Sequence, residues 1–383
     1  MPDEDVTPPT TAPAAHVVVA ERGAPPPPGG LWGALIRYQG IVVPFAGLVA
    51  AFLIGAILIR FQGVNPVYAY KTLFHSALLT TDGLNLTLER TTPLIFTGLA
   101  VAVPLRVGLF NIGAQGQLIC GALAAAVVGY KMHSAPGILI IVTALVCGIV
   151  AGAMWASIAA LLKTSRGVHE VISTIMLNSI ATNIIDYLIN NPFKEQGQAI
   201  PRTPEIAPQA FMHDMGIMPI GFPIAVILAV GTAWMLRRTT LGFQFETVGR
   251  NKHAARYAGM KINKMILLAL ALSGAFAGLA GGIETLGDVH RYESGFNANL
   301  GFDGITIALL ARSNPIATIP AAFLVGALRA GASSLQFDTG IQPEVVDMLL
   351  AITLLFVSLP LVAKLIFRRY AAKGSALTSG WGS

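Results

Sequence analysis

The sequence predicts an all-α, polytopic membrane protein with about ten transmembrane helices, some of them broken or short. The chain of 383 residues is 54% hydrophobic and only 11% charged, and its mean hydropathy is +0.67. Its apolar runs approach the ~20 residues that cross a ~30 Å hydrocarbon layer. Lys and Arg lie in short segments beside these runs, as membrane topology requires, rather than on one basic surface. These observations exclude a soluble fold and predict no nucleic-acid partner.

The two ends of the chain are predicted to lie outside the membrane. Residues 1–31 form a Pro-rich tail that includes APPPPGG and lacks the basic and apolar regions of a signal peptide. We therefore expect a disordered cytoplasmic tail at 1–31, a transmembrane domain at 32–367 and a second cytoplasmic tail at 368–383.

Hydropathy divides the transmembrane domain into ten apolar segments. The eighth is too short to span a membrane and is followed by Pro315, so we expect a broken or tilted helix there. Placing the N-terminus inside puts most Lys and Arg on the cytoplasmic side, which predicts that both termini are cytoplasmic. The segments are 40–60, 92–106, 111–130, 137–162, 168–189, 217–236, 264–284, 302–312, 316–335 and 342–366.

The chain lacks the motifs of an ATPase or a metalloenzyme. It contains no GxxxxGK[ST] loop, HExxH or CxxC. Cys120 and Cys147 lie in separate apolar runs without a His or Cys neighbour. We predict no catalytic site, no metal site and no bound cofactor in this chain, so that any ATP is bound by another chain.

The longest internal cytoplasmic loop, residues 237–263, contains VGRNKHAARYAGM at 248–260. A short helix from about Asn251 to Tyr257, closed by Gly259, would satisfy its backbone and leave a face of small side chains. An ordinary basic loop explains the charges alone, but the mixture of Gly, Asn and Ala favours a docking helix. The predicted docking residues are Gly249, Arg250, Asn251, Ala254, Ala255, Tyr257, Ala258 and Gly259.

The fifth segment carries a polar residue at every fourth position from 170 to 190. Such a row forms one ridge that winds around the helix and rarely faces lipid. The ridge either holds helices together or lines a pathway, with Asn178 as the most central candidate.

The stretch FNIGAQGQ at 110–117 places amides among glycines at the start of an apolar run. It suits either a cap and turn or a discontinuous helix whose polar groups meet an uncharged ligand. From this stretch and the polar ridge, the predicted pathway residues are Asn111, Gln115, Gln117, Thr174, Asn178 and Thr182.

Glycines on the seventh segment predict close helix packing. Gly274, Gly278 and Gly282 follow the GxxxGxxxG pattern, which lets two backbones approach each other.

Four stretches of the chain resemble one family of transport proteins. GLFNIGAQGQLICGALAAA, HEVISTIMLNSIA, VGRNKHAARYAGM and GFDGITIALLARSNPIA are similar to the permease subunits of bacterial ABC importers of the branched-chain amino acid and simple-sugar class, specifically its nucleoside branch. The resemblance covers roughly residues 40–365 and implies the ABC-importer permease fold. It also implies that 248–260 is the coupling helix. Family members commonly carry Glu where this chain has Gln115.

The resemblance also implies partners in the bacterial inner membrane. These are a second homologous permease subunit, a cytoplasmic ATPase that binds ATP and Mg, and an external substrate-binding protein, often a lipoprotein. The implied substrate is a nucleoside, with a simple sugar as the alternative. A self-contained secondary transporter is the rival class, but it would need a carboxylate or His near mid-membrane, which most spans lack.

Overall fold

The structure is a computed structural model that describes residues 39–296, 299–342 and 344–358. The predicted tails at 1–31 and 368–383 lie outside the described residues. Within these residues the named elements are all helices, joined by loops with two isolated β-bridges. The all-α prediction is therefore confirmed.

Six of the described helices are long and apolar enough to cross a membrane, and a bent pair would make a seventh span. The bent pair is α2 (Gln39–Phe61) and α3 (Pro66–Leu78), which meet at 115°. The predicted total of ten is not confirmed. The six helices are α4 (Thr81–Arg106), α6 (Gly137–Arg166), α7 (Glu170–Asn190), α8 (Gly221–Arg238), α11 (Ile262–Glu284), which continues into the π-helix η2 (Thr285–Val289), and α13 (Thr318–Thr339).

The remaining described α-helices are α5 (Ala114–Lys131), which equals α8 in length but is not among the spanning candidates, and four shorter ones. The four shorter helices are α9 (Thr240–Arg250), α10 (Lys252–Tyr257), α12 (Leu300–Leu310) and α14 (Glu344–Ser358). The 11 residues of α12 confirm that the eighth predicted segment is too short to span.

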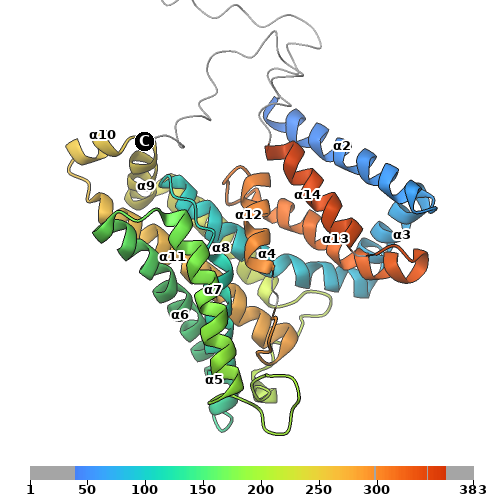
Figure 1. Ribbon diagram of the computed structural model, residues 1–383, viewed down its shortest axis with the longest axis horizontal. Coiled ribbons are helices and arrows are strands. Elements are labelled where there is room, and N and C mark those ends of the chain that lie inside the picture. Colours follow the sequence, from blue (N-terminus) through green and yellow to red (C-terminus); the bar gives the residue numbers. More distant parts are fainter. Residues whose placement is uncertain (1–38, 297–298, 343, 359–383) are drawn as a thin grey trace, which may run out of the picture.

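The helices form two groups on either side of α4 (Figure 1). One group contains α5, α6, α7 and α11, and the other contains α2, α3, α13 and α14. The core lies along α4 and α11. In the most apolar 18-residue stretch of these two helices, 78% and 72% of the residues are buried, whereas the corresponding share in α6 is 22%. The exposed row Ile138, Val142, Val146, Val150 on α6 repeats every four residues, which gives this helix a face suited to lipid.

A glycine seam joins α6 to α11. A Cβ atom on Gly274 would lie 2.2 Å from the carbonyl oxygen of Gly152, and Gly278 approaches α6 equally closely. Gly281 continues the contact against α5, whereas Gly282 meets the end of a leucine side chain at 3.3 Å. The predicted close packing is confirmed for the first two glycines of the pattern.

Three predicted boundaries need correction. Helix α4 begins at Thr81 rather than near 92, and α3 fills a region that we predicted to be a loop. Both stretches are too polar for a hydropathy window, and the continuously buried part of α4 begins only at Thr91. The predicted loop 237–263 contains the whole helix α9 before α10.

Candidate functional site

The short helix α10 has the geometry that the sequence predicts. The side chain of Asn251 caps it by accepting a hydrogen bond from the Ala254 N–H at 3.0 Å. Gly259 follows the helix with φ +76°, a conformation that favours glycine. The backbone N–H of Met260 then donates to the carbonyl of Ala255 at 3.0 Å, which closes the turn.

The predicted docking residues divide into an exposed set and two residues that pack inward, Ala255, which is buried, and Gly249, which is half-buried. Tyr257 is 93% exposed, whereas Ala255 is fully buried. Gly249 packs so closely on Arg106 that a Cβ atom would lie 2.1 Å from the Arg106 carbonyl oxygen. We therefore correct the assignment of Ala255 and Gly249, which hold α9 and α10 against the core rather than face outward. The exposed set is Arg250, Asn251, Ala254, Tyr257, Ala258 and Gly259.

A buried polar network surrounds the first turn of α5. The Asn111 side chain donates to Gln117 Oε1 at 3.0 Å and to Ser273 Oγ at 2.7 Å. Its own oxygen accepts from the Gly113 N–H at 2.9 Å. Gln115 Oε1 accepts a hydrogen bond from the backbone N–H of Gly301, the second residue of α12, at 2.7 Å. Ser273 is not among the predicted site residues, because a lone serine in an apolar run carries no pattern.

Asn178 connects α7 to the residues around the start of α5. Its oxygen accepts from the Gly116 N–H at 2.8 Å, and its nitrogen donates to the carbonyl of Ile112 at 2.9 Å. Thr174 Oγ1 accepts from the Ile112 N–H at 3.3 Å. Thr182, by contrast, is exposed and donates to the carbonyl of Asn178 within its own helix.

The structure thus brings five of the six predicted pathway residues to one place and leaves Thr182 on the outer face of α7. Their contacts tie helices together, which favours the helix-connecting interpretation of Asn178. Their part in passage stays a prediction.

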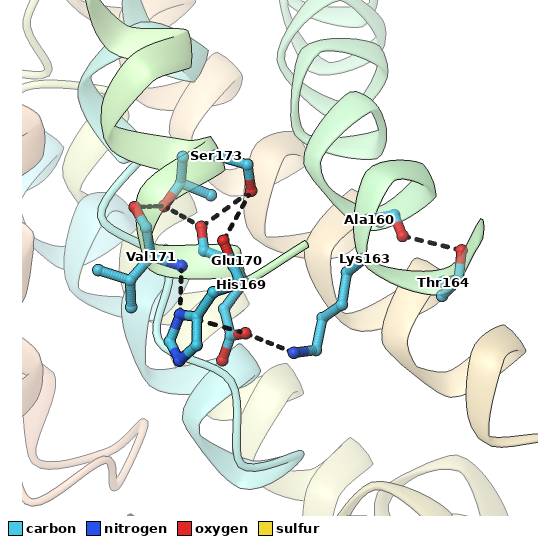
Figure 2. Close-up of polar contacts among 8 residues, drawn as sticks. Ala160, Lys163, Thr164, His169, Glu170, Val171 and Ser173 are labelled. Carbon is cyan, nitrogen blue, oxygen red and sulfur yellow. Dashed lines mark hydrogen bonds and ion pairs between the residues drawn. The ribbon is translucent and has the colours of Figure 1, made fainter. Parts of the chain in front are cut away.

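An ion pair fixes the turn between α6 and α7 (Figure 2). The ammonium of Lys163 lies against the carboxylate of Glu170, which is buried, and Gly167 turns the chain between them with φ +68°. His169 Nδ1 lies 3.8 Å from the same carboxylate and accepts from the Val171 N–H. This local pair could have been found from the basic end of α6 and the acidic start of α7.

A cavity of about 230 Å³ lies between α4, the start of α8 and the end of α11. Four acidic residues line it, and Arg90 Nη1 lies 3.5 Å from Asp288 and 3.9 Å from Glu284. No cluster with the donors of a metal site occurs among the described residues. The acidic residues are Glu89, Asp214, Glu284 and Asp288.

Helices that are long and apolar enough to span a membrane, with a buried polar network between them, define a multi-pass membrane protein. The chain belongs to the family described as the permease component of the branched-chain amino acid transport system, which matches residues 83–358.

Curated relatives align with nearly the whole chain. The guanosine ABC transporter permease protein NupP of Bacillus subtilis is 34% identical over 88% of this chain and 99% of its own length. The nucleoside ABC transporter permease protein NupB of Lactococcus lactis is 33% identical over 89% and 97%. The glucose ABC transporter permease protein TsgB13 of Haloferax volcanii is 34% identical over 85% and 88%. The family that the four stretches indicated is confirmed.

Proposed function

We propose that this chain is the membrane-spanning permease subunit of an ATP-driven importer that carries nucleosides across the bacterial inner membrane. The observation that carries this proposal is its similarity, over most of both chains, to relatives named as guanosine and nucleoside permeases. The chain itself hydrolyses nothing and provides the passage.

The exposed face of α10 supports a docking site for a cytoplasmic ATPase, which binds ATP and Mg. Tyr257 is almost fully exposed, and the small residues Ala254, Ala258 and Gly259 near it are exposed as well, so a partner surface can approach the backbone. The last turns of α8, α9 and α10 all carry arginine, as the positive-inside rule predicts for cytoplasmic segments: Arg237, Arg238, Arg250 and Arg256. A second homologous permease subunit and an external substrate-binding lipoprotein complete the proposed importer.

The polar groups inside the helices support a neutral, hydroxyl-rich substrate. They are chiefly amides and hydroxyls, as at Asn111, Ser273 and Thr174. A simple sugar is the second candidate, because the Haloferax relative is named as a glucose permease.

Uptake into vesicles that contain the complete importer tests the proposal. We expect ATP-dependent uptake of labelled guanosine that unlabelled nucleosides inhibit and that ribose, glucose and leucine do not. Equal inhibition by ribose or glucose would transfer the assignment to sugars. Uptake without the ATPase, driven by an ion gradient, would instead show a secondary transporter.

A further inference from the structure

The guanidinium group of Arg106 holds a carbonyl oxygen in the turn between α12 and α13. Arg106 is the last residue of α4, and its Nε and Nη2 atoms donate to the Ser313 carbonyl oxygen at 3.1 and 2.8 Å. Two N–H groups on one planar cation therefore fix the position of one oxygen. A lysine ammonium lacks this fork geometry.

The turn that Arg106 holds is conformationally strained. Arg312 and Ser313 have φ +51° and +55°, a region that residues other than glycine rarely occupy. The turn is closed by the Ser313 N–H, which donates to the Ala308 carbonyl at 2.8 Å. Two successive strained residues persist only where their surroundings hold them, and the Arg106 side chain supplies such a contact.

The backbone of Arg106 contacts a second element, helix α9. Gly249, near the end of α9, rests directly on the peptide that joins Arg106 to Val107. Gly108, with φ +72°, faces Gly249 from the same loop. The end of α9 thus touches the main chain of Arg106, while the side chain of Arg106 touches the α12–α13 turn.

A cavity of about 280 Å³ lies beside this contact. Arg106 and Pro315 line one part of it, and the end of α8 and the start of α9 line the rest. Gly249 of α9 is in direct contact with the main chain of Arg106. Arg106 therefore contacts α9 through its main chain and the α12–α13 turn through its side chain, beside this cavity.

We propose that Arg106 is a positioning residue that transmits displacement of α9 and α10 to the α12–α13 turn during transport. The inference rests on the proposed docking of the ATPase at α10. Transport then depends on the Arg106 fork, whereas binding of the ATPase and hydrolysis of ATP do not.

The test compares Arg106→Gln and Arg106→Lys in the complete importer in proteoliposomes. Both variants lose the fork, so we expect uptake to fall about tenfold, the scale of losing a hydrogen bond to a charged group. Hydrolysis stimulated by the substrate-loaded binding protein should persist, which raises the ATP consumed per substrate. Arg237→Gln is the matched control, because Arg237 lines the same cavity. The ATP that this variant consumes per substrate transported should equal that of the wild type.

Gly249→Ala provides a second route to the same contact. The added methyl group pushes α9 away from the Arg106 carbonyl, so the ATP-to-substrate ratio should rise here as well. An unchanged ratio in the Arg106 variants would overturn the proposal. The proposal would also be overturned if uptake and ATP hydrolysis both fell in proportion to the yield of complex, because Arg106 would then have only a structural role. Failure of the wild-type chain to bind the ATPase would instead refute the proposed function.

Discussion

At the scale of single residues, buried polar side chains of this membrane protein form hydrogen bonds with backbone atoms of other segments. Asn178 contacts the Ile112 carbonyl, which precedes α5, and the Gly116 N–H in the first turn of α5, where N–H groups have no partner within the helix. Lys163 and Glu170 also connect two helices, because their ion pair joins the end of α6 to the start of α7. Each residue therefore fixes one helix relative to another, in an interior that offers no water as an alternative.

Asn178→Leu is expected to destabilise the protein by about 2–4 kcal/mol, because it leaves the Ile112 carbonyl and the Gly116 N–H unsatisfied. Thermal unfolding in detergent measures the loss. Thr182→Val is the control, since Thr182 is exposed and bonds only within its own turn in the described contacts. Unchanged stability with slower uptake per folded molecule would show that Asn178 lines the pathway instead.

At the scale of helices, the closest packing depends on missing side chains. The glycines of α11 let its backbone meet α6 and α5, so that three helices pack as one unit without large side chains between them. Helices α9 and α10 are packed differently. The short, capped helix α10 projects from the core and is fixed by the inward side chain of Ala255. One arrangement gives rigidity and the other gives an accessible surface.

Gly278→Ala should cost about 1–3 kcal/mol of stability, because the new methyl group would lie 2.2 Å from a backbone oxygen that cannot turn aside. Gly282→Ala is the matched control on the same helix. Its methyl group would meet a leucine side-chain end at 3.3 Å, which can shift. Melting temperatures measured in the same detergent compare the two variants. Equal decreases in melting temperature would contradict the close packing of Gly278 against α6.

At the scale of the whole molecule, two helix groups meet along α4, and the last residue of α4 lies beside both α9 and the α12–α13 turn. Helices α9 and α10 lie at one end of the molecule, whereas α7 ends near the other (Figure 1). A partner that binds α10 therefore acts on the end of the central helix.

Ala254→Trp is expected to reduce co-purification of the ATPase by about tenfold or more, since bulk at the centre of an interface removes close contact. Ala254 is exposed, so insertion and melting temperature should not change. Met215→Trp places the same indole side chain at an exposed site in the loop before α8 and should leave co-purification intact. Full ATPase recovery with Ala254→Trp would show that the partner binds elsewhere.

The sequence by itself determined the helical membrane fold, the short helix at 252–257 and the family. Each of these rests on a local pattern: apolar length, an Asn cap followed by a glycine turn, and contiguous motifs. It did not determine the start of α4 at Thr81, the inward side of Ala255 or the role of Ser273. Hydropathy reports how apolar a stretch is, and only the packing of distant helices decides whether a polar stretch is covered by protein and which face of a short helix turns inward. For the same reason the contact between Arg106 and Ser313, 207 residues apart, exists only in the tertiary structure.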